Sequence, residues 1–428
     1  MRETIYAPAG LVGRTALTVL RLSGPRTGEM VAALAGGLPA PRVASLRSLR
    51  DAAGRVLDRA LVLWFPGPRS YTGEDCAELH LHGGGAVFHA VSEALTALGA
   101  RPAEAGEFTR RAVLEGKLDL LEAEATLDLI EAETDTQRAQ ALRHLSGEMS
   151  GVAEAWRASL LRLLAHQEAL IDFPDEDLPP EVDAALRDGI AALRGDFARA
   201  LAEGARGEKL RSGVTIAIVG APNAGKSTLL NALCRRDIAI VSPIAGTTRD
   251  VLEARIVLEG VPVTLLDTAG LRDTVDPIEA EGVRRARARL QEADMVLALS
   301  EDGAWPDVSD GSVMLHVRTK SDVSSAAVGA DVAISAVSGA GMTELLTALS
   351  LHVRNLAGVS AAPTLTRARH RAVLLAAEAQ LEAAEHAEWP ELRGEHLRQA
   401  MRDIGRLTGM VDTEEVLGSI FGEFCIGK

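Results

Sequence analysis

The sequence has few cysteines, no long apolar run and a deficit of positive charge. Its 428 residues include only 3 cysteines, which lie too far apart for a disulfide framework or a cysteine-ligated metal site. No apolar run approaches a membrane span, and the first ten residues show neither a secretory signal nor a transit peptide. We therefore expect a cytoplasmic protein in a reducing compartment. A formal net charge of -15 argues against the wrapping of nucleic acid by bulk electrostatics.

A glycine-rich segment from Gly220 to Ser227, GAPNAGKS, has the spacing of a phosphate-binding loop. It follows an apolar run, Val214 to Val219, that predicts a buried parallel strand, and it precedes a predicted helix that starts near Thr228. In such a loop the backbone N–H groups and the helix N-terminus face phosphate oxygens. Lys226 adds a positive charge at the β- and γ-phosphates, and Ser227 offers a hydroxyl to Mg²⁺. The segment predicts a nucleoside triphosphate site.

Further segments follow the order of a guanine-nucleotide fold. An apolar run ends in Asp267-Thr268-Ala269-Gly270, whose Asp would hold a Mg²⁺ water and whose Gly amide would meet the γ-phosphate. Thr319-Lys320-Ser321-Asp322 and Ser335-Ala336 each follow a later predicted strand, at the edge where open α/β sheets bind ligands. This arrangement resembles the GTPase domain of the translation-factor-related class. The residues then expected to contact GTP are Asn223, Ala224, Gly225, Lys226, Ser227, Thr228, Ser242, Pro243, Ile244, Ala245, Gly246, Thr247, Thr248, Asp267, Thr268, Ala269, Gly270, Thr319, Lys320, Asp322, Ser335 and Ala336.

Two positions depart from the usual pattern of such domains. The base-reading motif N-K-x-D here begins with Thr319, so one contact of the usual amide is weakened or replaced by a hydroxyl. Asp322 can still accept hydrogen bonds from the N1–H and the amine of guanine, so guanine stays the expected base. Leu271 stands where Ras-like proteins carry a water-orienting glutamine. We expect the missing catalytic help to come from a monovalent cation that Asn223 binds near the β- and γ-phosphates.

The predicted elements divide the chain into several domains. Residues 1–118 alternate strand-like runs with helical patterns and predict a compact α/β domain. Residues 119–212 and 357–428 carry Ala, Leu, Glu and Arg at helical spacing, and we interpret them as two parts of one helical domain. The GTPase domain, residues 213–356, would be inserted between them. The expected fold class is multidomain α/β, with a discontinuous helical domain and an inserted Ras-like, parallel-sheet P-loop GTPase domain.

Further motifs are spread along the whole chain. They are Ser70-Tyr71-Thr72-Gly73-Glu74-Asp75, His82-Gly83-Gly84, Gly106-Glu107-Phe108-Thr109-Arg110-Arg111, Gly116-Lys117-Leu118-Asp119-Leu120, Ile171-Asp172-Phe173, GTTRD, DTAGLR and Cys425-Ile426-Gly427-Lys428. Together with the P-loop, these motifs resemble the tRNA-modification GTPase family MnmE, also called TrmE. The tetrapeptide CIGK at the end is the most specific of them.

The resemblance implies a set of ligands and site residues. In this family the N-terminal domain dimerises and holds 5-formyl-tetrahydrofolate or a related one-carbon folate. The implied folate contacts are Arg21, Glu78, Lys117 and Lys428. Cations suit the glutamyl carboxylates of such a ligand, and a carboxylate suits its pterin ring. The implied K⁺ ligands are Asn223, Ser242, Ile244 and Thr247, the implied Mg²⁺ ligands are Ser227 and Thr248, and the implied catalytic residues are Glu279, which orients water, Lys226 and Asn223.

The resemblance also implies partners and a reaction. GTPase domains of two protomers would meet across the nucleotide, and the homodimer would join the FAD-dependent protein MnmG in a heterotetramer. The complex would install an aminomethyl or carboxymethylaminomethyl group on carbon 5 of the wobble uridine of certain tRNAs.

Three alternatives stay open at the level of the sequence. Cys425 is either a nucleophile that adds to a pyrimidine ring or a packing residue. Lys428 offers either its ammonium group or the terminal carboxylate to a folate. The rival function is a regulatory GTPase switch of the ribosome-assembly type. Such switches usually carry a basic RNA-binding appendage, and none is visible in this sequence.

Overall fold

The computed structural model describes residues 3–172, 180–235, 253–267, 293–306, 313–323, 329–357, 364–410, 420–422, 424 and 427. It divides into two compact units, one of residues 1–127 with 405–428 and the other of residues 128–404. The four-segment division predicted from the sequence stays a prediction. Among the described residues, no helix is long and apolar enough to cross a membrane.

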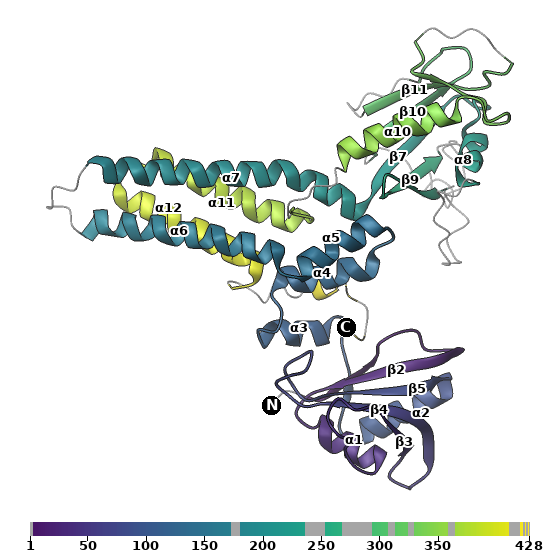
Figure 1. The fold of residues 1–428 in the computed structure, drawn as a ribbon, viewed down its shortest axis with the longest axis vertical. Helices are drawn as coiled ribbons and strands as arrows, with labels where there is room; N and C mark the ends of the chain where they lie inside the picture. The colour runs from purple at the N-terminus through teal and green to yellow at the C-terminus, as the bar shows by residue number, and fades with distance from the viewer. Residues whose placement is uncertain are drawn as a thin grey trace, which may run out of the picture. The chain divides into compact units, whose positions relative to one another are not determined.

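The first unit is built on a six-stranded sheet with the order β3-β4-β5-β2-β1-β6 (Figure 1). Its strands are β1 (Ile5–Pro8), β2 (Thr15–Ser23), β3 (Ser45–Arg50), β4 (Val56–Phe65), β5 (Cys76–Gly83) and β6 (Arg101–Pro102). Neighbouring strands are antiparallel, except that β1 and β6 are parallel. Side chains alternate between the two faces of such a sheet, so Leu20 and Leu79 lie in one core with α1 (Thr27–Ala35) and α2 (Gly85–Ala97).

The other face of this sheet carries exposed apolar side chains. Leu46 and Leu61 are paired across β3 and β4, and they are 56% and 42% exposed. Leu17 of β2 is 53% exposed. A row of leucines on an open face is an unpartnered apolar surface.

The two ends of the chain meet in the first unit. After α3 (Glu107–Leu114), helix α4 (Leu120–Glu131) packs Leu120 and Leu127 against Phe421 and Phe424 in a small buried cluster. Gly427 lies so close to β1 that a Cβ atom there would be 1.9 Å from the carbonyl oxygen of Pro8. The first unit therefore includes residues from both ends of the chain.

The second unit contains a six-stranded sheet with the order β12-β11-β10-β7-β9-β8. Its strands are β7 (Val214–Gly220), β8 (Glu253–Leu258), β9 (Val261–Asp267), β10 (Met295–Ser300), β11 (Val313–Arg318) and β12 (Val332–Ala333). All neighbouring strands are parallel except the β8–β9 hairpin. The apolar runs that predicted these strands lie in one core with α8 (Lys226–Cys234) and α10 (Met342–Leu356).

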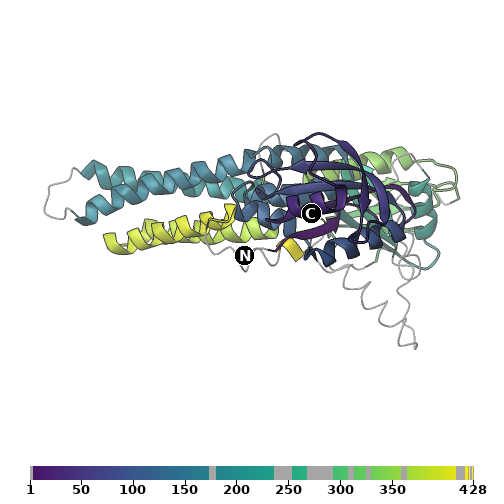
Figure 2. The same cartoon turned by 90° about the horizontal axis from the view of Figure 1, so that it is seen from below.

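Long helices complete the second unit (Figures 1 and 2). They are α5 (Asp135–Leu145), α6 (Glu148–Asp172), α7 (Pro180–Ser212), α11 (Ala368–His386) and most of α12 (Pro390–Thr408). Helix α7 packs against α6 and α11, with Trp156 and Phe197 in edge-to-face contact at 5.1 Å. Helices α6 and α7 are separate, since α6 ends at Asp172 and α7 begins at Pro180.

A single residue, Gly213, joins α7 to β7. Its φ is +82°, and a Cβ atom there would lie 2.9 Å from the carbonyl oxygen of Pro262. Glycine is the residue that adopts this conformation without a steric penalty. The central strand of the sheet is thus connected directly to the longest helix.

Candidate functional site

The P-loop connects β7 to α8 at the carboxyl edge of the parallel strands. Gly225, the residue before α8, has a φ of 92°, which favours glycine. The Lys226 side chain is buried, and its Nζ donates hydrogen bonds to the carbonyl oxygens of Gly220 at 2.7 Å and Ala221 at 3.0 Å. The loop therefore curls around the ammonium group, as the sequence pattern predicts for a phosphate-binding loop.

Two of the residues predicted to lie near Mg²⁺, Ser227 and Asp267, are in contact with each other. Ser227 lies in the first turn of α8, and its Oγ donates a hydrogen bond to Asp267 Oδ2 at 2.7 Å. Asp267 ends β9, the strand beside β7, and is 5% exposed. A hydroxyl and a carboxylate are the hard oxygen donors that Mg²⁺ prefers, so these two residues fit the ion.

Thr319, where the usual base-reading motif carries asparagine, lies next to Gly225 of the P-loop. Its side chain is buried, and its Cβ would be 3.8 Å from a Cβ atom placed on Gly225. Its backbone N–H donates to the carbonyl of Ser300 at 2.9 Å. The Thr319 Oγ1 is buried and has no hydrogen-bond partner among the described residues. The hydroxyl that replaces the usual amide thus lies close to Gly225 of the P-loop, 4.0 Å from the position of a Cβ atom there.

The remaining base-reading residues follow β11 and β12. The Ser321 N–H donates to the carbonyl of Ile334 at 3.0 Å, which joins the T-K-S-D segment to Ser335 and Ala336. Asp322 is exposed at the end of this turn. Lys320 has a φ of 52°, and its Nζ donates to Glu301 Oε2 at 2.6 Å.

Asn223 is exposed in the P-loop and has a φ of 66°, a conformation that asparagine tolerates. Ala224 is buried beside it, and Thr228 lies on α8. The predicted site residues that lie outside the described residues are Ser242, Pro243, Ile244, Ala245, Gly246, Thr247, Thr248, Thr268, Ala269, Gly270, Glu279, Cys425 and Lys428. The metal and catalytic roles of all these residues stay predictions.

A cavity of about 360 Å³ lies on the open face of the first sheet, where β2, β4 and β5 meet residues 69–71. Arg21 and Glu78, two of the predicted folate contacts, both line it and form an ion pair at 3.0 Å. The Arg21 guanidinium lies 5.6 Å from the centre of the Tyr71 ring. Lys117 is not among the lining residues. Its side chain packs beside Gly73, which follows the cavity-lining residues 69–71 in the chain. The structure therefore brings two of the four predicted contacts together.

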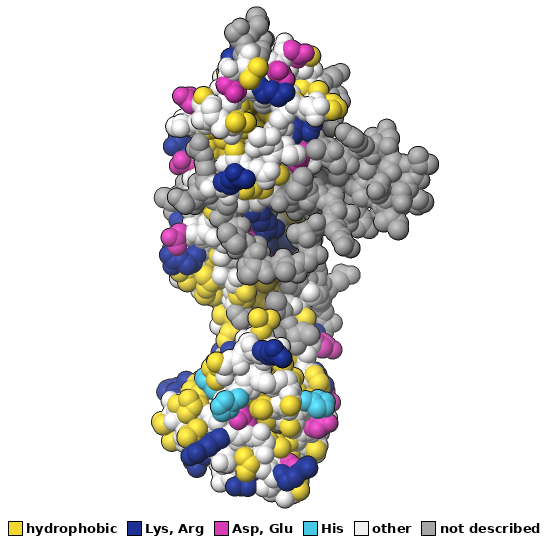
Figure 3. Space-filling view, turned by 90° about the vertical axis from the view of Figure 1, so that its right-hand side faces the viewer, with side chains coloured by type: hydrophobic (Ala, Val, Ile, Leu, Met, Phe, Trp, Pro, Cys, Tyr) yellow, Lys and Arg dark blue, Asp and Glu magenta, His cyan; other side chains and the backbone are white. Residues whose placement is uncertain are grey.

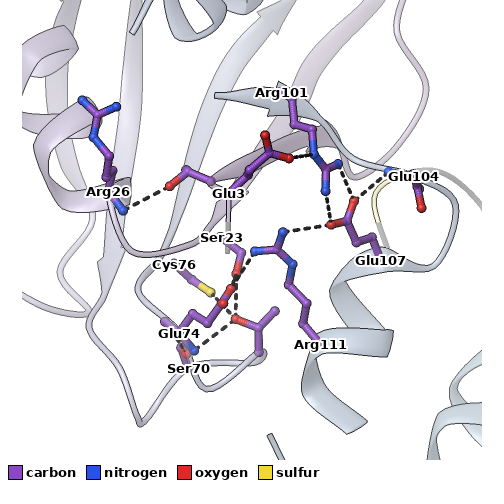
Figure 4. Close-up of polar contacts among 12 residues, drawn as sticks. Glu3, Ser23, Arg26, Ser70, Glu74, Cys76, Arg101, Glu104, Glu107 and Arg111 are labelled. Carbon is purple, nitrogen blue, oxygen red and sulfur yellow. Dashed lines mark hydrogen bonds and ion pairs between the residues drawn. The ribbon is translucent and has the colours of Figure 1, made fainter. Parts of the chain in front are cut away.

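A buried network of charged residues fixes the loop beside this cavity (Figure 4). Arg111 of α3 donates to Glu74 at 2.8 Å and to Glu107 at 2.8 Å. Arg101 binds both carboxylate oxygens of Glu107, at 2.7 and 2.8 Å. Burial raises the pKa of Glu107, but these hydrogen bonds outweigh it and lower the pKa to about 2. Glu107 is therefore ionised at neutral pH, as its arginine partners require.

The same network continues through hydroxyl groups to a cysteine. Ser23 Oγ donates to Glu74 at 2.9 Å and is hydrogen-bonded to Thr72 at 2.7 Å. A contact of 3.1 Å links Thr72 to the thiol of Cys76, which lines the cavity. Sequence reasoning did not identify this network. Thr72 and Glu74 belong to one quoted motif and Glu107 and Arg111 to another, but the pairing of those motifs is visible only in the fold. The other members, Ser23, Cys76 and Arg101, lie outside both motifs.

Comparison with known proteins identifies the family. A family model described as the GTP-binding protein TrmE N-terminus matches residues 4–117, and one described as the MnmE helical domain matches residues 120–425. The relative from Gluconacetobacter diazotrophicus, a "tRNA modification GTPase MnmE", is 57% identical and covers 99% of this chain and 98% of its own length. The chain belongs to the MnmE family.

A second MnmE, from Granulibacter bethesdensis, is 54% identical over 100% of both chains. Among solved structures, Aquifex aeolicus Era bound to GDP and AlF4- is 26% identical over 41% of this chain and 69% of its own. The TM-score of this comparison is 0.26. The MnmE family models, with the two sheets, confirm the resemblance seen in the motifs and the expected fold class.

Proposed function

We propose that this chain hydrolyses GTP and that hydrolysis serves the modification of tRNA. The observation that carries the proposal is the P-loop, in which Lys226, Ser227 and Asp267 are held at one edge of a parallel sheet. The names of the MnmE relatives support the tRNA part of the proposal.

The residues of the P-loop have distinct roles in this proposal. Lys226 exchanges its two carbonyl partners for the β- and γ-phosphates and offsets their charge. Ser227 and Thr248 would bind Mg²⁺, and Asp267 would accept a hydrogen bond from a water on the ion. The bound ion neutralises charge that develops on the phosphate oxygens. Asp322 reads guanine, and Thr319 offers its unpaired hydroxyl near the nucleotide.

Potassium completes the hydrolytic site in this proposal. Asn223 contributes one ligand, with Ser242, Ile244 and Thr247 as the others, and Glu279 orients the attacking water. The exposed position of Asn223 within the P-loop supports the first of these assignments.

In this proposal the first unit binds the one-carbon donor. We infer that a tetrahydrofolate occupies the cavity beside Arg21 and Glu78, with Lys117 and Lys428 as further contacts. The volume of about 360 Å³ falls in the range of small-molecule sites. The chain then acts in the cytoplasm with the FAD-dependent protein MnmG on carbon 5 of the wobble uridine.

The homodimer of this proposal uses the first unit. The exposed leucines Leu17, Leu46 and Leu61 support it, because an apolar sheet face is suited to pairing with a second copy. Figure 3 shows one side of the molecule, on which hydrophobic, basic, acidic and His side chains are mixed over the first unit.

Nucleoside analysis of tRNA from cells that lack this protein tests the proposed function. We expect the modified wobble uridine to disappear and to return with the wild-type chain, but not with a Lys226→Ala variant. Lys209→Ala is the matched control, because Lys209 lies on α7 and pairs with Asp294 rather than with the P-loop. Unchanged nucleosides in the deletion strain would favour a regulatory switch instead.

A further inference from the structure

The charges that line the cavity of the first unit do not cancel. Arg21, Arg42 and Arg69 line it together with a single acidic residue, Glu78. Arg21 is paired with Glu78, whereas Arg42 and Arg69 form no ion pair with any residue that the structure describes. In a chain with a net charge of -15, this cavity keeps two unpaired cations.

Arg42 is held in place by its backbone and its neighbours. Its φ is +63°, a conformation that is costly for a residue with a Cβ atom. Its N–H donates to the carbonyl of Trp64 at 2.8 Å, its guanidinium lies 5.8 Å from the centre of the Phe65 ring, and its Nη2 donates to the carbonyl of Arg69. A cation that is held without a carboxylate partner is prepared for an anion from outside the chain.

Arg69 belongs to the loop that the buried network fixes. The next residue, Ser70, donates from its Oγ to the carbonyl of Glu74, and the Glu74 side chain binds Arg111. Arg42 and Arg69 are exposed, whereas Arg21 and Glu78 are partly buried. The two unpaired cations therefore lie toward solvent, and the neutral Arg21–Glu78 pair lies deeper.

We propose that Arg42 and Arg69 bind the two carboxylates at the glutamate end of the folate and so determine the specificity of this cavity for a dianionic ligand. The inference rests on the folate part of the proposed function. Guanidinium groups bind carboxylates through paired, charge-assisted hydrogen bonds. The pterin end then lies beside Glu78, whose carboxylate accepts hydrogen bonds from the ring N–H groups. The folate is thereby bound in one orientation.

Calorimetric titration of the full-length protein with two probes tests this inference. The first probe is 5-formyl-tetrahydrofolate, and the second is its diamide, in which neutral carboxamides replace both glutamyl carboxylates. The variants are Arg42→Gln, Arg69→Gln and the double variant. Arg59→Gln is the matched control, because Arg59 is an exposed arginine of β4 that does not line the cavity.

We expect each single substitution to weaken folate binding about fivefold to tenfold and the double substitution about 50-fold, because each removes one charged pair. The wild-type protein should bind the diamide about as weakly as the double variant does, and the double variant should not distinguish the two probes. Added salt should weaken folate binding by the wild type more than by the double variant, because exposed pairs are screened.

Three results would overturn the inference. If the wild type binds folate and the double variant binds it equally well, the arginines are not specificity residues, and the folate assignment survives. If the double variant loses affinity for both probes to the same extent, the arginines have only a structural role. If the wild type binds neither probe, the folate part of the proposed function fails together with this inference.

Discussion

The P-loop presents backbone groups and one lysine to its ligand, whereas the cavity of the first unit is lined by side chains from separate strands and loops. The P-loop residues are consecutive in the chain, from Gly220 to Ser227. The cavity combines Arg21, Arg42, Arg69 and Glu78, and its Arg21–Glu78 pair is separated by 57 residues. The P-loop therefore depends on one local turn, whereas the cavity depends on the packing of the whole first unit.

The largest expected effect is a loss of stability that is confined to the first unit. Arg111→Met leaves Glu74 and Glu107 buried without their shared partner, and we expect it to destabilise the first unit by about 3–5 kcal/mol. Hydrogen exchange on the full chain should show the loss in the first sheet and leave the second sheet protected. Arg55→Met, which removes the pair that the exposed Arg55 forms with Asp51, should have a much smaller effect on stability. Equal effects of the two substitutions would contradict a structural role for the buried network.

The second prediction separates the regions by activity. Lys226→Ala should lower the kcat of GTP hydrolysis about 10²–10³-fold, because the charge at the β- and γ-phosphates is lost. Folate binding should be unchanged, since Lys226 lies in the other unit. Steady-state turnover and calorimetry on the same preparation measure both. A simultaneous loss of folate affinity would mean that the two regions are not independent.

The third prediction concerns the stability of the first unit at acidic pH. The pKa of Glu107 is lowered from an ordinary value of 4.5 to about 2 in the folded chain. A lowered folded pKa adds stability that is fully present above the unfolded pKa and is lost as pH falls through the folded pKa. The first unit should therefore lose about 1–2 kcal/mol between about pH 4.5 and 2, a figure discounted for partial solvent access. Glu107→Gln should flatten this part of the stability curve, and an unchanged slope would show that other carboxyl groups cause it.

The fourth prediction concerns the second unit alone. Replacing K⁺ by Na⁺ should slow GTP turnover about tenfold, because the sequence offers no glutamine after the D-x-x-G segment. Asn223→Ala should abolish the difference between the two salts. Equal rates for the wild type in K⁺ and Na⁺ would exclude a catalytic role for potassium.

The smallest expected effect concerns the affinity for the guanine base of GTP. Thr319→Asn should tighten GTP binding about threefold to tenfold, because an amide adds a hydrogen bond where the Thr319 hydroxyl now has no partner among the described residues. Titration of a fluorescent guanine nucleotide measures the change. An unchanged affinity would indicate that the threonine already makes this contact when the nucleotide is bound.

The same contrast explains how much could be predicted from the sequence. Strand β7 was predicted within one residue at each end, because it is a short apolar run next to a recognisable glycine-rich turn. The position of the P-loop between this strand and α8 was predictable for the same reason. The sequence did not predict the buried position of Arg111 or the two unpaired arginines of the cavity. Each of these features depends on contacts between segments that lie far apart in the sequence. Arg21 and Glu78 were identified only through the family resemblance.

Gly213 has a mechanical consequence for the second unit. It is the only residue between the 33-residue helix α7 and the strand that ends in the P-loop. A helix of this length extends about 50 Å, so a change of direction of about 10° at Gly213 would displace its far end by roughly 9 Å. The close approach of Gly213 to Pro262 leaves no space for a side chain at this pivot. The strand that leads into the P-loop is thus connected, through one glycine, to a helix that would carry any change of direction over about 50 Å.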